Sequence, residues 1–132
     1  MTLMADPSPA YASTVVVGAP DRWIEVCAFD DLLPDRGVCA LVDGVAVAVF
    51  RCWPDDELHA VANVDPFSNA SVLSRGIVGT IGGRAVVASP VFKHRFDLQT
   101  GCSLDDDAVR VAVHEVEVRD GRVLVAADPA PM

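Results

Sequence analysis

Short runs of apolar side chains alternate with turn residues along most of this chain. Most runs hold four to eight residues and are bounded by glycine, proline or aspartate. This pattern is typical of β-strands, because runs of this length are too short for most helices. The predicted strands cover residues 23–27, 38–41, 45–52, 57–62, 84–88, 95–98, 109–113, 116–118 and 122–126.

The turns between these runs predict that neighbouring strands are antiparallel. Asp43-Gly44 lies between two apolar runs and is a typical two-residue hairpin turn, because both residue types tolerate positive φ. Asp120-Gly121 has the same composition before the last run. Valine alternation from residue 109 shifts by one position at His114-Glu115, which predicts a β-bulge or a break in the strand. The whole pattern predicts an all-β fold with little helix.

Three segments depart from the strand pattern. Residues 63–83 are rich in glycine and are predicted to be irregular, apart from a helical turn at 70–73. Residues 1–20 are rich in proline, alanine and serine without periodicity, and are predicted to be a mobile N-terminal arm. Residues 128–132 are predicted to be a C-terminal tail. The remaining residues, 21–127, are expected to form one domain.

Composition and charge narrow the possible partners. With 132 residues and 52% apolar side chains, the chain can bury a core without a metal or a disulfide. Its 10 basic and 19 acidic side chains give a net charge of −9, which disfavours nucleic acid and anionic membranes. No run approaches the roughly 18 apolar residues of a membrane span, and the acidic start lacks the basic region of a secretory signal. We therefore expect a cytoplasmic protein.

The cysteines do not have metal-binding spacing. Cys27, Cys39, Cys52 and Cys102 are scattered, without a C-x-x-C or C-x-x-H pair. We expect small buried residues in a reducing compartment, and their pairing in space stays open.

No catalytic site is expected on this chain. His59 alternates with apolar neighbours and is predicted to be a packed or edge residue, while His114 and Glu115 are adjacent and face opposite sides of a strand. Ser89 is followed by proline and lacks the glycine-flanked turn that exposes a nucleophile. Three consecutive acids at 105–107 are predicted to form a solvated turn. The glycines at 79, 82 and 83 are predicted to form a flexible loop.

Two segments resemble the loops that hold the iron–sulfur cluster of Rieske proteins. Residues 89–101, Ser-Pro-Val-Phe-Lys-His-Arg-Phe-Asp-Leu-Gln-Thr-Gly, are similar to the second Rieske loop, Cys-Pro-x-His-Gly-x-x-Phe-Asp-x-x-Thr-Gly. A Rieske cluster needs two thiolates and two imidazoles. On the resemblance, Asn63 and Asp65 stand at the ligand positions of the first loop, and Ser89 and Phe92 at those of the second. Asp65 is the single strong metal-binding group among them, so no metal is expected. His94 could replace Phe92 only by a register slip, and it would find no thiols nearby.

The chain from about 23 to 125 is similar to the small subunit of the cytoplasmic NAD(P)H-dependent assimilatory nitrite reductase, a Rieske-like domain that lacks the cluster ligands. The resemblance is carried by residues 63–68, 72–79 (Val-Leu-Ser-Arg-Gly-Ile-Val-Gly), 86–90 and 95–101. It implies a Rieske-like antiparallel β-sandwich and an accessory chain without a cofactor of its own. The partner it implies is the large subunit, a flavoprotein (FAD) with sirohaem and a [4Fe–4S] cluster that reduces nitrite to ammonium in nitrate assimilation.

The two loops are then expected to serve as a surface for this partner. Basic side chains gather in this half of an acidic chain and are candidate interface residues: Arg75, Arg84, Lys93, His94 and Arg95. The alternative is that they are simply solvated. Two other functions stay open, namely a Rieske-type electron carrier with an unconventional cluster and a stand-alone β-sandwich module that binds another protein.

Overall fold

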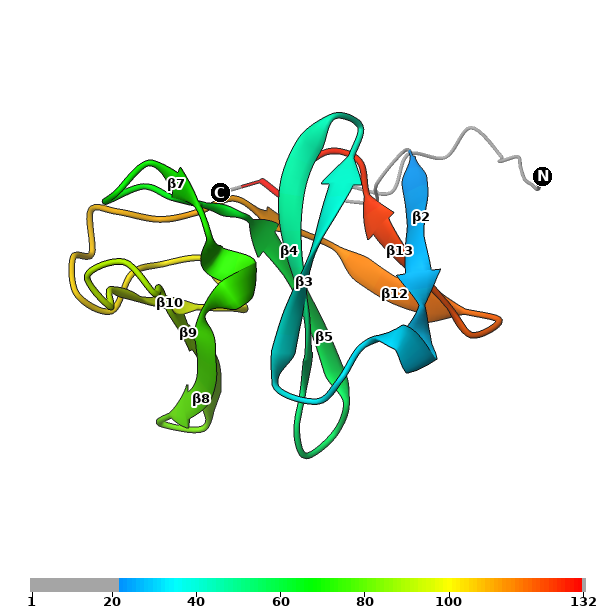
Figure 1. The fold of residues 1–132 in the computed structure, drawn as a ribbon, viewed down its shortest axis with the longest axis horizontal. Coiled ribbons are helices and arrows are strands. Elements are labelled where there is room, and N and C mark those ends of the chain that lie inside the picture. The colour runs from blue at the N-terminus through cyan, green and yellow to red at the C-terminus, as the bar shows by residue number, and fades with distance from the viewer. Residues whose placement is uncertain (1–21, 132) are drawn as a thin grey trace.

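The computed structural model describes residues 22–131, and they form an all-β fold, as predicted (Figure 1). Helical structure within this part is limited to the 3₁₀ turns η1 (Phe29–Asp31) and η2 (Leu73–Arg75). The predicted arm at 1–20 lies outside the described residues. The strands are β2 (Trp23–Ala28), β3 (Arg36–Val42), β4 (Val45–Cys52), β5 (Glu57–Ala62), β6 (Val64–Asp65), β7 (Ala70–Ser71), β8 (Ile77–Ile81), β9 (Arg84–Ala88), β10 (Arg95–Asp97), β11 (Val113–His114), β12 (Val116–Arg119) and β13 (Arg122–Ala126).

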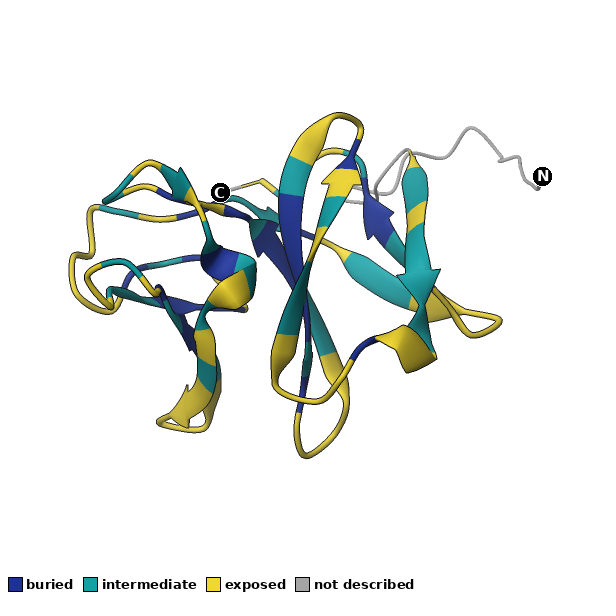
Figure 2. Cartoon of the chain, viewed as in Figure 1, coloured by how far each residue is buried: buried dark blue, intermediate teal, exposed yellow. Residues whose placement is uncertain are grey.

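Strand β4 lies between two hydrophobic clusters, which explains its nearly continuous apolar sequence. Val47 and Val49 pack with residues of β13, whereas Ala48 and Phe50 pack with residues of β5, β9 and β10. All four side chains are buried, and the dark strand in the centre of Figure 2 shows this. A strand that is buried on both faces does not need a polar face.

Antiparallel sheets surround these two clusters. β3, β4, β5 and β11 form one sheet in the order β11-β5-β4-β3, and β2, β12 and β13 form another in the order β12-β13-β2. The predicted hairpin joins β3 to β4, with positive φ at both Asp43 and Gly44. The predicted break at Glu115 is confirmed, because β11 pairs with β5 whereas β12 pairs with β13. The chain changes sheets at this residue.

A smaller lobe holds the two loops that resemble Rieske loops. It consists of the sheet β10-β9-β8 and the short hairpin β6-β7, which group together at one side of the molecule in Figure 1. Phe96, Leu98 and Val87 are fully buried beneath them. The two loops are therefore supported by a hydrophobic cluster that this lobe shares with β4 and β5.

The prediction that residues 63–83 are irregular is wrong. β8 pairs with all of β9, and Gly82 and Gly83 form its turn with positive φ. The strand was missed because Ile77 and Ile81 are exposed and Gly79 lies between them, so the usual apolar alternation is lost. The helical turn predicted at 70–73 is also wrong, since Ala70–Ser71 is strand β7 and the 3₁₀ turn starts at Leu73.

The strand predicted at 109–113 is much shorter than expected. Only Arg110, through an isolated bridge to Cys102, pairs before β11 begins at Val113. Val111 and Gly101 instead hold this segment to the end of the second loop, through a bond from Val111 N to the Gly101 carbonyl at 2.8 Å. The alternating valines of residues 109–113 are therefore buried to different degrees, but the segment does not form a continuous strand.

Candidate functional site

Two of the four residues that were predicted to stand at cluster-ligand positions are joined directly by a hydrogen bond. Asp65 lies in β6 at the start of the first loop, and Ser89 follows β9 at the start of the second. Ser89 Oγ donates to Asp65 Oδ2 at 2.6 Å, and both residues are buried. Asp65 Oδ1 accepts a second bond from the Phe67 backbone N at 2.9 Å. A charge-assisted bond between side chains therefore links the two loops.

Asn63 holds the 3₁₀ turn η2 in place. Its Oδ1 accepts from Ser74 N at 2.7 Å, and its Nδ2 donates to Ser71 Oγ at 2.8 Å. The Asn63 carbonyl also accepts from Val72 N and Leu73 N, each at 3.0 Å. Because its amide group is buried and bonded on both sides, Asn63 acts as a structural residue here.

Phe92 lies at the tip of a tight turn that Ser89 organises. Ser89 N donates to the His94 carbonyl at 2.8 Å, and Ser89 Oγ accepts from Val91 N at 3.2 Å. Phe92 and Lys93 both have left-handed backbones, with φ of 59° and 60°. Phe92, which the resemblance to the second Rieske loop places at a ligand position, is 75% exposed and projects into solvent.

A stacked pair of rings forms a second connection between the loops. The His94 and Phe67 rings lie with their centroids 3.7 Å apart and 12° from parallel. His94 Nδ1 is buried and finds no hydrogen-bond partner within residues 22–131. The His94 ring therefore packs against Phe67 of the first loop.

The basic side chains proposed as an interface differ in their surroundings. Arg84 forms an ion pair with Asp97, and Arg95 pairs with Asp105 at 2.8 Å. Arg75 lies in η2, and neither it nor Lys93 forms an ion pair with any described residue. Much of the expected positive charge is thus neutralised within the chain.

Asp105 is exposed, as predicted for the turn at 105–107, and it also binds Arg95 of β10. Its Oδ2 accepts from Arg95 N at 2.7 Å in addition to the ion pair. The hydrogen bonds from the Arg95 side chain and backbone lower the pKa of the Asp105 carboxyl. Asp106 and Asp107 are exposed as expected.

Stability should fall in acid because of Asp97. Burial alone raises the pKa of Asp97, but hydrogen bonds from Arg84 and from the backbones of Gln99 and Thr100 outweigh it, so the pKa lies below its usual 3.8. Such a group stabilises the fold above its unfolded pKa, and this contribution is lost as the pH falls through the folded pKa. In urea denaturation, the stability gap between wild type and Asp97→Asn should be full above about pH 5 and should close as the pH falls below about 4. A gap that stays constant across this range would contradict the assignment.

The cysteines are not grouped as ligands. All four are free thiols, and Cys27, Cys39 and Cys52 lie in strands as predicted. Burial, together with the charges of Asp35 and Glu57, raises the pKa of Cys52 to about 11, which disfavours the thiolate that binds metals. The prediction of burial is correct for Cys52, whereas Cys27 and Cys102 are half-buried and Cys39 is exposed.

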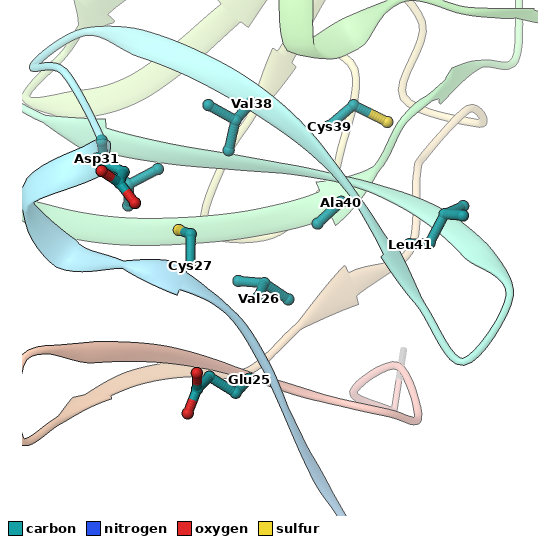
Figure 3. Close-up of a pocket in the computed structure, with 9 residues that line it drawn as sticks. Glu25, Val26, Cys27, Asp31, Val38, Cys39, Ala40 and Leu41 are labelled. Atoms are coloured by element: carbon teal, nitrogen blue, oxygen red, sulfur yellow. The ribbon is translucent and has the colours of Figure 1, made fainter.

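Cys27 and Cys39 line one cavity without facing each other. This cavity, of about 270 Å³, lies between β2 and β3. Figure 3 shows that the two sulfur atoms point in different directions. The sequence left open whether any cysteines pair, and in the structure Cys27 and Cys39 are free thiols on separate strands.

The remaining histidines have structural partners. His59 Nε2 lies 3.0 Å from Glu57 Oε1 in β5, as expected for a packed or edge residue. His114 is buried, and its Nδ1 lies 2.8 Å from the Ala126 carbonyl. Within residues 22–131 there is no group of three or more His, Cys, Asp or Glu that could hold a metal ion. No helix in this part of the chain is long and apolar enough to cross a membrane.

Two features of the site were not found from the sequence. The bond between Asp65 and Ser89 joins residues 24 positions apart, and only the polar character of both residues pointed to it. Arg36, which lies opposite Arg75 across a groove, was not among the predicted site residues. Nothing in the sequence around Arg36 indicates that it lies near residues 74–78.

Comparisons with known proteins agree with this geometry. Residues 22–126 match the family model described as Rieske-like [2Fe-2S] domain. The nitrite reductase (NADH) small subunit of Escherichia coli K12 is 43% identical over 102 residues, which are 77% of this chain and 94% of that protein. A Mycobacterium tuberculosis crystal structure described as an NADH-dependent nitrite reductase small subunit is 50% identical with a TM-score of 0.76, covering 84% of this chain and 96% of that one.

One relative is a much longer protein. The nitrite reductase [NAD(P)H] large subunit of Klebsiella oxytoca is 34% identical over 126 residues, which are 94% of this chain and 13% of that protein. That large subunit therefore contains a segment similar to the whole domain described above.

Proposed function

Because this chain belongs to the nitrite reductase small subunits within the Rieske-like domain family, we propose that it is the accessory small subunit of a cytoplasmic NAD(P)H-dependent nitrite reductase. In this role it binds the large subunit and carries neither a cluster nor a catalytic residue. The reduction of nitrite, as part of nitrate assimilation, then takes place on the partner. The redox groups needed for it, FAD, sirohaem and a [4Fe–4S] cluster, are assigned to the large subunit.

The Klebsiella oxytoca protein supports the partnership. A segment similar to this chain lies within a nitrite reductase large subunit there, so both parts are covalently joined in one polypeptide. A domain that is useful when fused is expected to work in contact with the same partner when it is separate. Linking two modules raises their effective concentration without requiring new contacts.

The residues present do not fit a [2Fe–2S] cluster. The buried hydrogen bond from Ser89 to Asp65 joins two of the proposed ligand positions, the Asn63 amide is hydrogen-bonded through both its oxygen and its nitrogen, and Phe92 is exposed. A Rieske cluster requires thiolate and imidazole donors, and these positions provide neither. The hydrogen bond from Ser89 to Asp65 is the observation that carries the proposal of a cluster-free loop pair.

Metal analysis and co-purification test the proposal together. The purified chain should be colourless, with far less than about one iron per chain, whereas a Rieske-type electron carrier should hold about two. Expressed with the large subunit, it should co-elute as a stable complex. A brown protein with stoichiometric iron would favour the electron carrier, and a lack of complex formation would favour the stand-alone binding module.

The predicted interface on the loops remains a proposal. Lys93 and the exposed Phe92 are adjacent at the tip of the second loop, and Lys93 has no ion pair with a described residue. Arg84 and Arg95 are less available, because each already pairs with an aspartate. Among the predicted residues, Arg75 and Lys93 are therefore the better candidates for contacting the large subunit.

A further inference from the structure

An open groove runs between the start of β3 and the segment from η2 to β8. It has a volume of about 520 Å³. One wall comes from Asp35, Arg36 and Gly37, and the other from residues 74–78, Ser-Arg-Gly-Ile-Val. The second wall belongs to the stretch that carries much of the resemblance to nitrite reductase small subunits, and no role described above explains its exposed side chains.

Close backbone packing fixes the shape of this groove. A Cβ on Gly37 would lie 2.6 Å from the Ser74 carbonyl, and one on Gly76 would lie 2.5 Å from the Ala88 carbonyl. Neither site has room for a side chain. Gly37 lets the two walls approach each other at the Ser74 carbonyl, and Gly76 lets the second wall pack closely on β9. Asn63 also holds η2 through its bond to Ser74 N. The groove is therefore preformed, which reduces the entropy cost of binding.

The groove combines positive charge with an exposed apolar side chain. Six of the ten Lys and Arg side chains form ion pairs with carboxylates of the chain, but Arg36 and Arg75 form none with any residue in 22–131. Asp35 is the one acid in the lining, and its Oδ1 accepts from Trp53 N at 3.0 Å. Ile77, the first residue of β8, is 78% exposed, and most of β8 is exposed in Figure 2.

We propose that this groove binds a segment of the nitrite reductase large subunit that presents acidic side chains next to an apolar one. Two guanidinium groups without a described ion-pair partner, in a chain of net charge −9, favour a partner with carboxylates at this place. Ile77 supplies the apolar anchor beside them. The inference rests on the proposed function, and it assigns Arg36, Arg75 and Ile77 to the interface.

Binding of variants to the purified large subunit tests the groove. Arg36→Glu/Arg75→Glu should bind about 100-fold more weakly than wild type, with a smaller dependence on salt, and Ile77→Asp about 10-fold more weakly. Arg119→Glu/Arg122→Glu is the charge control, because it makes the same change in net charge on exposed residues of β12 and β13, which pair with Glu117 and Glu25. It should bind within about 3-fold of wild type. Thermal unfolding shows whether each variant is folded.

Hydrogen exchange on the unmodified complex provides a second measurement that does not depend on variants. Residues 74–78 should exchange more slowly in the complex than in the free chain. If folded groove variants bind as well as wild type, or if residues 74–78 are not protected from hydrogen exchange in the complex, the groove is not the binding site. The proposed function would then still stand. If wild type forms no complex at all, both are overturned.

Discussion

Replacing Gly101 with alanine is expected to abolish stable folding. The backbone of Gly101 has φ of +81°, and a Cβ there would lie 2.1 Å from the Val111 carbonyl oxygen. The chain cannot move away easily, because Val111 N donates to the Gly101 carbonyl and Gly101 N donates to Asp97 O at 2.7 Å. A clash with backbone at a strained position should cost more than about 4 kcal/mol, a large part of a typical domain's stability.

Gly121→Ala separates the clash from the backbone strain. Gly121 also has positive φ, +75°, but apart from its two chain neighbours no described residue has an atom within 4 Å of the place that a Cβ would occupy. Alanine there should cost only about 1–2 kcal/mol, the penalty for a left-handed alanine. Urea denaturation of both variants, together with their soluble yield, measures the difference. If both variants lose the same amount of stability, the contact with Val111 is not the reason that position 101 requires glycine.

Removing the Asp65 side chain is expected to have the second-largest effect. Asp65→Ala leaves the buried Ser89 hydroxyl and the Phe67 N–H without their acceptor. Each buried polar group without a partner costs about 1–3 kcal/mol, so we expect a loss of about 3 kcal/mol. Ser89→Ala should cost about 2 kcal/mol, because it leaves the buried carboxylate with one donor fewer.

A double-mutant cycle shows whether these two residues act together. The double variant Asp65→Ala/Ser89→Ala should be more stable than the sum of the single losses predicts, by at least about 1 kcal/mol. Asp65→Asn is the matched control, since it keeps the shape and one acceptor oxygen, and it should lose less than alanine. Strictly additive losses in urea denaturation would mean that the loops do not depend on the bond between Ser89 and Asp65.

Local patterns predicted strands well where burial was regular. The hairpin at Asp43-Gly44 and the change of sheet at Glu115 were both visible, because turn residues and a shift in alternation leave local marks. β8 was missed because its isoleucines face outward and its usual strand pattern is broken by Gly79. Its place in the sheet depends on pairing with β9, which a local pattern does not report.

The sequence suggested which residues belong to the candidate site but not how they interact. The resemblance to Rieske loops proposed four ligand positions, and the structure brings two of these residues, Asp65 and Ser89, into contact. The basic residues near them were expected to contact a partner or to be solvated, but Arg84 and Arg95 have acidic partners within the chain. Ion pairs depend on which side chains meet in space. The sequence therefore showed that the basic residues are present but not that acidic residues pair with them.

The amino-acid sequence alone determined the strand-rich fold and the absence of thiol and imidazole groups at the loop positions, because both are properties of residue type and local order. Only the tertiary structure decided that Ser89 bonds to Asp65, that Asn63 holds η2, and that Arg36 lies across a groove from Arg75. These relations join residues distant in the chain. A hydrogen bond or a groove exists only when folding brings such residues within a few ångströms.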